Sequence, residues 1–318
     1  MIPRSPTQVA LTRDDIESYL RIALPDAATT VNILASCSEI SGGGYAAVWK
    51  AELDDGRAVV LKVGPPKHVR QLRYERGLMA AEAAYYRMVR PLGVPVPEVL
   101  HAEEDWLCVS FLPGTPLSLL DGDSQGVWSQ LGSAMAKVHA VTGEYFGYEG
   151  GDRPRGPVWA DVFAEMVEDV LADAIDWHVT LPLEPQCIRG FVRAGGDALA
   201  QVRRPALVHF DLWDGNVLCT GDRLTGLVDG ERYLYGDPLI DFVSPAIREP
   251  LEIVPRHPFA RGYRPPVEWD EAAFTRLALY RMHLLLLMVV EGPSRGMTPQ
   301  VQAQRAGWLL SQSAEITA

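Results

Sequence analysis

Cysteine and positive charge are both scarce in this sequence. The four cysteines are far apart and form no C-x-x-C pair, so the sequence argues against a disulfide framework or a zinc site. Lysine and arginine number 29 against 41 acidic residues, and the net charge of −12 argues against nucleic-acid or anionic-membrane partners. The longest apolar run, 284–290, is far shorter than the roughly 20 residues that span a bilayer. No secretory signal follows Met1, so we expect a cytoplasmic protein without a membrane partner.

The most informative stretch is 205–244. It contains the pattern H-x-D-L-x-x-x-N, with His209, Asp211 and Asn216 at its fixed positions, and Asp229 follows a short apolar run. Phosphoryl transfer needs a carboxylate that accepts the proton of the attacking hydroxyl, and an amide and a second carboxylate that hold magnesium. Asp211 suits the first role, and Asn216 and Asp229 suit the second. If Asp211 and Asn216 were only turn residues that bond their own backbone, Asp229 would have no explanation.

A glycine-rich turn and a lysine occur in the N-terminal part of the chain. Gly42, Gly43 and Gly44 lie between two strand-like runs, and Lys62 lies in the apolar strand-like run 58–63. Glycines without a Cβ let backbone N–H groups approach phosphates. We predict that the glycines cover the phosphates of ATP and that Lys62 binds them. The alternatives are a flexible turn and a lysine on the solvated face of an edge strand.

The predicted lysine needs an acidic partner on the helix that follows it. The helical segment 73–89 offers Glu75 and Glu82, of which we favour Glu82. The other acid is then expected on a solvated helix face.

The apolar strand that ends before Pro113 and Gly114 is predicted to be the hinge between two lobes. Backbone groups around Ser110, Phe111 and Leu112 are then candidates for pairing with an adenine edge.

The C-terminal part of the chain is predicted to be mainly helical. In the amphipathic helix 159–177, Asp161 and Glu165 belong to an acidic face that is either simply solvated or attracts a cationic substrate. Further helices are predicted at 126–139, 188–202, 274–290 and 301–310.

Together these motifs resemble the aminoglycoside phosphotransferase and choline kinase-like superfamily. The similarity extends over about 35–245 and includes the segments 95–100, 111–114 and 131–139, and Gly236-Asp237-Pro238 with Asp241-Phe242. It implies an α+β, bilobal, protein-kinase-like fold. The N-lobe, 1–110, would carry an antiparallel sheet and a helix, and the larger, mainly helical C-lobe would span 111–318.

The resemblance also implies roles for individual residues. Asp211 would be the catalytic base, and Asn216 and Asp229 the ligands of Mg²⁺. Lys62 with Glu82 would position the phosphates of ATP, or of GTP. Asp237 and Asp241 would pin loops of the C-lobe, and His209 would brace the catalytic loop.

Three departures from related patterns bear on the acceptor and on the class of kinase. Phe210 stands where protein kinases have arginine and where the small-molecule kinases usually have glycine, which raises the question whether its ring reshapes the acceptor site. Asp229-Gly230-Glu231 replaces D-F-G, and no A-P-E element is found, so a protein kinase regulated by loop phosphorylation is disfavoured. Glu231 is a candidate either for the metal or for the substrate pocket. Asp214 is a further substrate candidate.

The sequence therefore predicts an ATP- and Mg²⁺-dependent O-phosphotransferase that acts on a small hydroxylated molecule. We favour an aminoglycoside or another amine-bearing antibiotic as the acceptor, and hence a role in antibiotic resistance. A metabolic acceptor (a sugar, fructosamine, amino alcohol or choline-like compound) is the alternative, since the loop from Asp211 to Asn216 is similar to that of fructosamine kinases. A nucleotide-binding pseudokinase is the alternative from another class. The sequence leaves open a monomer or a homodimer.

Overall fold

The N-terminal lobe is built on one antiparallel sheet. The computed structural model describes residues 5–26, 33–40, 44–122 and 124–317. Five strands form the sheet in the order β1-β2-β3-β5-β4. Their bounds are Leu34–Glu39, Ala47–Leu53, Ala58–Val63, Val99–Ala102 and Trp106–Ser110 for β1 to β5. The last of these strands ends at the proposed lobe boundary.

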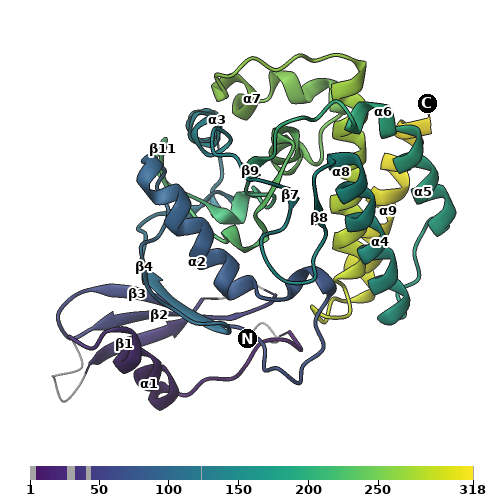
Figure 1. Ribbon diagram of the computed structural model, residues 1–318. Coiled ribbons are helices and arrows are strands. Elements are labelled where there is room, and N and C mark those ends of the chain that lie inside the picture. Colours follow the sequence, from purple (N-terminus) through teal and green to yellow (C-terminus); the bar gives the residue numbers. More distant parts are fainter. Residues whose placement is uncertain (1–4, 27–32, 41–43, 123, 318) are drawn as a thin grey trace.

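Two helices accompany this sheet (Figure 1). Helix α1, Arg13–Ala23, begins at a capping box formed by Thr12 and Asp15, and it buries Ile16 and Leu20 in a small core against the sheet. Helix α2, Leu78–Val89, follows the one-turn helix η2, Arg73–Glu75, and packs against β4 and β5. Because α2 faces the second lobe as well, its side chains reach the interlobe region.

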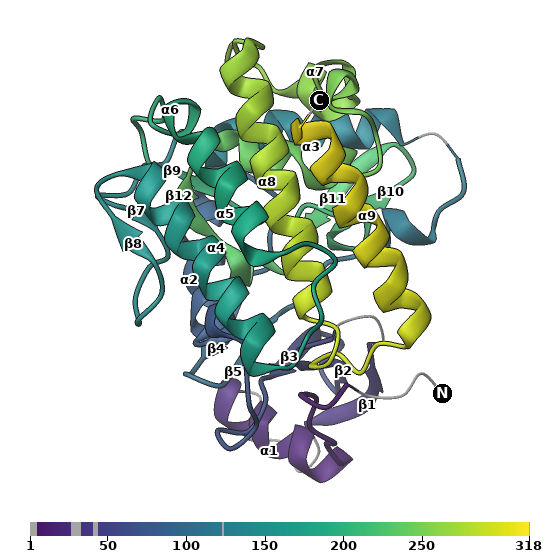
Figure 2. The same cartoon turned by 90° about the vertical axis from the view of Figure 1, so that its right-hand side faces the viewer.

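The larger lobe is mainly helical. Its α-helices are α3 Gln125–Val138, α4 Trp159–Asp176, α5 Pro185–Ala194, α6 Gly196–Leu199, α7 Pro258–Gly262, α8 Glu271–Val290 and α9 Pro299–Thr317. Helices α4, α8 and α9 lie side by side at one end of the lobe (Figures 1 and 2). The single helix predicted over 188–202 is wrong, because it is divided into α5 and α6 at Gly195. A Cβ at Gly195 would lie 2.5 Å from the Leu279 side chain of α8.

Two small sheets, which the sequence analysis did not predict, support the loops of the C-lobe. One has the order β11-β10-β6 and the other β8-β7-β12-β9. Strand β9, Ala206–Val208, leads into the catalytic loop, and β10, Val217–Thr220, leaves it. The remaining bounds are β6 Thr115–Pro116, β7 Phe146–Gly147, β8 Arg155–Gly156, β11 Arg223–Leu227 and β12 Leu234–Gly236.

Helix α8 is the hydrophobic centre of the C-lobe. It is long and apolar enough to cross a membrane by length and composition, but 78% of its most apolar window is buried inside the protein. It also buries Arg281 and His283. Its apolar residues are therefore explained by packing against α4, α6 and α9.

A close contact between α3 and α7 gives a test of this packing. A Cβ on Gly132 would lie 2.0 Å from the backbone oxygen of Phe259, whereas a Cβ on Gly190 in α5 would meet nothing within 4 Å. Gly132→Ala should therefore lower the free energy of unfolding by about 1–3 kcal/mol, because α7 must move. Gly190→Ala, the matched control, should raise it by about 0.5–1 kcal/mol through helix propensity. Urea denaturation measures both, and equal effects of the two variants would contradict the close contact.

Candidate active site

Asp241 fixes the start of the catalytic loop. Its carboxylate accepts hydrogen bonds from the backbone N–H groups of His209 (2.9 Å) and Phe210 (2.7 Å). The same carboxylate lies 2.9 Å from Nε2 of His139, the residue that caps the C-terminal end of α3. Asp241 is fully buried. The prediction that Asp241 pins a C-lobe loop is confirmed. Asp237 also does so, since it caps the one-turn helix η7, Pro238–Phe242, and accepts a hydrogen bond from Tyr280.

Phe210 adopts a left-handed backbone conformation, with φ +71°. This region suits glycine and is strained for a residue with a Cβ, which gives a physical reason for the glycine that related kinases usually have there. The ring of Phe210 is 3% exposed and stacks on His283 of α8, with the ring centroids 5.8 Å apart. The ring thus lies in the core of the C-lobe, and this position gives no support to a reshaped acceptor site.

His209 holds Asp211 together with the loop 228–232, which carries the predicted metal ligand Asp229 and is here named the metal loop. Its Nδ1 accepts the N–H of Asp211 (3.2 Å), and its Nε2 donates to the carbonyl of Val228 (3.1 Å). Burial lowers the pKa of His209, which favours the neutral imidazole that these two bonds require. The bracing role predicted for His209 is confirmed, because it links Asp211 to the residue that precedes Asp229.

Asn216 brings the end of the catalytic loop to the same place. It lies in the one-turn helix η5, Asp214–Asn216, and its side-chain amide donates to the carbonyl of Asp211 (2.9 Å). Its own carbonyl accepts the N–H of Val228 (3.0 Å). Asn216 is therefore bonded both to Asp211 and to Val228, the residue that precedes Asp229.

Lys62 joins the two lobes at this site. Its ammonium lies 2.5 Å from a carboxylate oxygen of Glu82 on α2 and 2.5 Å from one of Asp229 in the C-lobe. Burial disfavours the charged amine, but the carboxylates of Asp229 and Glu82 outweigh burial and raise the pKa of Lys62. Lys62 is thus a charged, buried lysine, and the interpretation as a solvated edge-strand residue is wrong. The preference for Glu82 over Glu75 is confirmed.

Tyr86 couples Glu82 to the metal loop. Its hydroxyl donates to the carboxylate of Glu82 and accepts the backbone N–H of Asp229 (3.0 Å). Asp229 has a left-handed φ of +58° at the start of the one-turn helix η6, Gly230–Arg232. The next residue, Gly230, has no room for a side chain, because a Cβ there would lie 2.2 Å from the ring of Tyr85.

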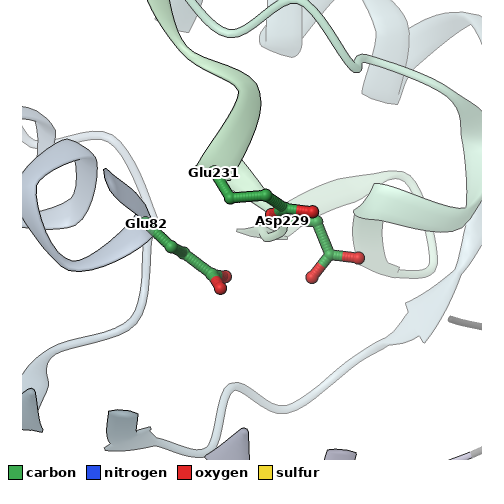
Figure 3. A group of neighbouring side chains, drawn as sticks. All are labelled: Glu82, Asp229 and Glu231. Atoms are coloured by element: carbon green, nitrogen blue, oxygen red, sulfur yellow. The ribbon is translucent and has the colours of Figure 1, made fainter. Parts of the chain in front are cut away.

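Three carboxylates converge between the lobes (Figure 3). One oxygen each from Glu82, Asp229 and Glu231 lies within 4.8 Å of the others. Burial, together with the charges of Asp229 and Glu82, raises the pKa of Glu231 to about 8. Among the described residues, Oε2 of Glu82 and Oε2 of Glu231 are buried without a hydrogen-bond partner. Such a group of oxygen ligands fits a hard divalent cation such as Mg²⁺.

Asp211 lies beside a buried arginine, Arg232. Its carboxylate is 3.6 Å from Nε of Arg232, and its side chain is 19% exposed. Burial raises the pKa of Asp211, and the guanidinium of Arg232 opposes that rise. A carboxylate held in this way is a suitable proton acceptor for a hydroxyl that reaches it.

The hinge residues occupy the end of β5. The N–H of Phe111 donates to the carbonyl of Ala58 (3.1 Å), and the N–H of Ser110 donates to the carbonyl of Glu98 (2.9 Å). Both N–H groups are therefore used within the lobe. Pairing with an adenine edge stays a prediction for the other backbone groups of Ser110, Phe111 and Leu112.

The predicted glycine-rich turn is described only at its last residue. Gly42 and Gly43 lie outside the described residues. The carbonyl of Gly44 accepts hydrogen bonds from the hydroxyls of Ser5 (2.6 Å) and Thr7 (2.8 Å). The N-terminal segment therefore anchors the end of this turn.

The three candidate substrate acids other than Glu231 are exposed. Asp214 lies in the catalytic loop, and Asp161 and Glu165 lie on the outer face of α4. No hydrogen bond or ion pair within the described part of the chain joins any of them to Asp211. Their role in binding an acceptor stays a prediction.

One expectation about the acidic residues is wrong. Glu75 was expected on a solvated helix face, but it is 0% exposed and forms an ion pair with Arg295. The sequence analysis missed Arg295 and also Arg232, Glu291 and Tyr74, which surround Glu75. The signals were present but weak: Arg232 directly follows Glu231, and Glu291 and Arg295 have the i, i+4 spacing of a paired acid and base.

Replacing Phe210 with glycine tests which of two effects dominates at this position. Relief of the left-handed conformation should gain about 1–2 kcal/mol, and loss of the buried ring should cost about 3–5 kcal/mol. We therefore expect Phe210→Gly to lower the free energy of unfolding by about 2 kcal/mol, measured by chemical denaturation. A more stable variant would show that the backbone strain is the larger effect.

The comparisons with known proteins agree with this geometry. The model of the phosphotransferase enzyme family matches residues 36–275. A probable ketoamine kinase of Staphylococcus aureus is 26% identical over 272 residues, which are 80% of this chain and 86% of the relative. The structure of a candidate fructosamine-3-kinase from Thermobifida fusca superposes with a TM-score of 0.69 and 21% identity, covering 94% of this chain and 100% of that one. The complex of APH(2'')-IIa with streptomycin and ATP gives a TM-score of 0.60 and 14% identity, covering 97% and 99%.

The structural likenesses confirm the predicted α+β, bilobal, protein-kinase-like fold. The family match extends over most of the chain and includes Lys62, Glu82, Asp211, Asn216 and Asp229. The chain therefore belongs to the phosphotransferase enzyme family and is an enzyme that transfers phosphate to a hydroxyl group of a small molecule.

Proposed function

We propose that this enzyme uses ATP and Mg²⁺ to phosphorylate a hydroxyl of an amine-bearing, polyhydroxylated small molecule. The observation that carries the proposal is the position of Lys62, which contacts both Glu82 and Asp229 across the two lobes while Asp211 lies in the adjoining loop. ATP and a divalent metal are what the family implies. The chain holds the residue types that this chemistry needs in one place.

The proposed mechanism is an in-line displacement without a covalent enzyme intermediate. The acceptor oxygen forms a bond to the γ-phosphorus as the bond to the β–γ bridging oxygen breaks, and ADP leaves. Asp211 accepts the proton of the acceptor hydroxyl. Lys62, held by Glu82, positions the phosphates, and His209 and Asn216 keep Asp211 in place.

Asp229, Asn216 and Glu231 are the proposed metal-binding residues. Their oxygen atoms suit Mg²⁺, which would neutralise the charge of the phosphates. Glu231 was left open between metal and substrate by the sequence. Its convergence with Asp229 and its unpartnered oxygen favour the metal.

For the acceptor we now favour a ketoamine, such as a fructosamine, over an antibiotic. The support is the 26% identity to a probable ketoamine kinase over most of both chains, together with the fructosamine kinase-like loop from Asp211 to Asn216. An aminoglycoside stays the second candidate. The structural likeness to APH(2'')-IIa and the exposed acids Asp161 and Glu165, which would attract a polyamine, support it.

Substitution of the proposed base should separate binding from transfer. Asp211→Asn is expected to lower kcat by about 100- to 10,000-fold, because the neutral amide cannot accept the acceptor's proton. The affinity for Mg²⁺·ATP should change by less than about threefold, since Asp211 is not among the groups proposed to hold the phosphates. The control Asp197→Asn replaces an exposed carboxylate on α6 and should leave both unchanged. Unaltered turnover in Asp211→Asn would remove Asp211 from the role of base.

The proposed role of Asp229 in metal binding can be tested by thermal stability. ATP should raise the Tm of the wild-type enzyme more in the presence of Mg²⁺ than in its absence, because a ligand that binds only the native state stabilises it. Asp229→Asn should abolish that Mg²⁺-dependent part. A full Mg²⁺ effect in this variant would show that the metal is held elsewhere.

An acceptor panel tests the preferred substrate. ADP release should be measured with fructosyl amines, aminoglycosides, plain sugars and amino alcohols, and the product should be located by mass spectrometry. We expect kcat/KM for a fructosyl amine to exceed that for any aminoglycoside by at least about tenfold. The reverse order would favour the antibiotic candidate.

A further inference from the structure

A buried ionic cluster connects the two lobes next to the proposed active site. Arg295, in the connection between α8 and α9, forms ion pairs with Glu75 of the N-lobe and with Glu291 (3.7 Å). Arg232 pairs with the same Glu291 (2.7 Å). The hydroxyl of Tyr74 accepts hydrogen bonds from Arg232 (3.2 Å) and Arg295 (3.0 Å) and donates to Glu291. Two guanidinium groups thus lie close together in a protein with a large negative net charge.

This cluster extends from the glycine-rich turn to the catalytic base. At one end, a Cβ on Gly44 would lie 2.5 Å from Cδ and 3.1 Å from Nε of Arg295, so the arginine side chain is in contact with the last glycine of the turn. At the other end, Nε of Arg232 lies 3.6 Å from Asp211. In both views the connection between α8 and α9 lies at the end of these helices nearest the five-stranded sheet (Figures 1 and 2). A phosphate covered by Gly44 and attacked near Asp211 would lie beside the two arginines.

Arg295 has hydrogen-bonding capacity that the protein does not use. Its side chain is 8% exposed, and the contacts to Glu75, Glu291 and Tyr74 all involve Nη2. Nη1 is buried and has no hydrogen-bond partner among the described residues. A guanidinium carries five N–H donors in a fork that matches phosphate oxygens, and buried donors are normally paired. Nη1 is therefore a donor that a ligand can use.

We propose that Arg295 is a phosphate-contacting residue, whose Nη1 donates to the transferring phosphoryl group of the bound nucleotide. The inference rests on the proposed function and adds a second cation to Lys62 at the phosphates. Negative charge on the phosphoryl oxygens and the leaving ADP must be neutralised during transfer, and a fixed guanidinium does this without reorganisation. Glu75, Glu291 and Tyr74 hold the guanidinium in place.

The competing role for Arg295 is purely structural, as a clamp between the lobes. A clamp acts through the ion pair with Glu75, so removal of either partner should have the same consequence. A phosphate contact acts through Nη1. Glu291 and Tyr74 still hold the guanidinium when Glu75 is replaced, so this contact should be largely intact without Glu75. Glu75→Gln is therefore the variant that separates the two roles.

The experiment compares binding of Mg²⁺·ADP with binding of Mg²⁺·ADP plus aluminium fluoride, which imitates the phosphoryl group in transfer. Isothermal titration calorimetry on the full chain gives both affinities without knowledge of the acceptor. In the wild type, aluminium fluoride should tighten ADP binding. Arg295→Gln should lose about 100-fold or more of that gain, while Mg²⁺·ADP alone binds within about threefold of wild type.

Three further variants serve as controls. Glu75→Gln should keep most of the gain from aluminium fluoride. Arg276→Gln removes an arginine of α8 that pairs with Asp237 (2.9 Å). This variant should have a lower Tm, but aluminium fluoride should tighten its ADP binding as much as in the wild type. Arg295→Lys keeps a charge that can pair with Glu75 but lacks the fork, and we expect a Tm near that of wild type and a partial loss of the gain. This variant keeps the test valid if Arg295→Gln does not fold.

The outcomes separate this inference from the function on which it rests. A wild-type enzyme that binds no Mg²⁺·ADP would overturn the proposed function and, with it, the role of Arg295. Suppose that Arg295→Gln and Arg295→Lys bind Mg²⁺·ADP normally and that aluminium fluoride tightens this binding as much as in the wild type. This result would overturn the role of Arg295 alone. Equal losses in Glu75→Gln and Arg295→Gln would identify a clamp.

Discussion

The active site depends on one buried cation, the ammonium of Lys62, which lies between two carboxylates from different lobes. Glu82 comes from the helix that covers the N-terminal sheet, and Asp229 comes from a loop of the C-lobe. A buried amine is tolerated only with close anionic partners, so the position of Lys62 constrains both lobes at once. The left-handed backbone of Asp229, the hydroxyl of Tyr86 and the absence of a side chain at Gly230 all serve to bring the second carboxylate to this point.

The catalytic loop is held in place by another buried acid, Asp241. Asp241 fixes the backbone of His209 and Phe210, and His209 in turn holds Asp211. The proposed base is thereby placed by a chain of hydrogen bonds that begins in the core. This arrangement also explains why Phe210 can remain in a left-handed conformation. Its backbone N–H is bonded to Asp241, and its ring is packed against His283.

The motif residues were predictable because phosphoryl transfer fixes both their types and their order. Lys62, Glu82, Asp211 and Asn216 follow an order that the chemistry requires, and the local hydrophobic pattern also predicted most helices of the C-lobe. The cluster of Arg232, Glu291 and Arg295 was not predictable in this way. Its members come from separate parts of the chain, and an isolated acid or base in a sequence is normally interpreted as solvated. Glu75 shows the error, since its burial depends on a partner more than 200 residues away.

The sequence by itself determined the class of the enzyme, which is a kinase-like fold that acts on a small-molecule acceptor, and it named the residues that we propose for the nucleotide and the base. Those features follow from short patterns whose chemistry tolerates little change. Only the tertiary structure decided that Glu231 joins Glu82 and Asp229, that the ring of Phe210 is buried, and that Arg295 reaches the glycine-rich turn. These facts depend on where distant side chains meet in a packed interior, and local patterns in the sequence carry no information about such meetings.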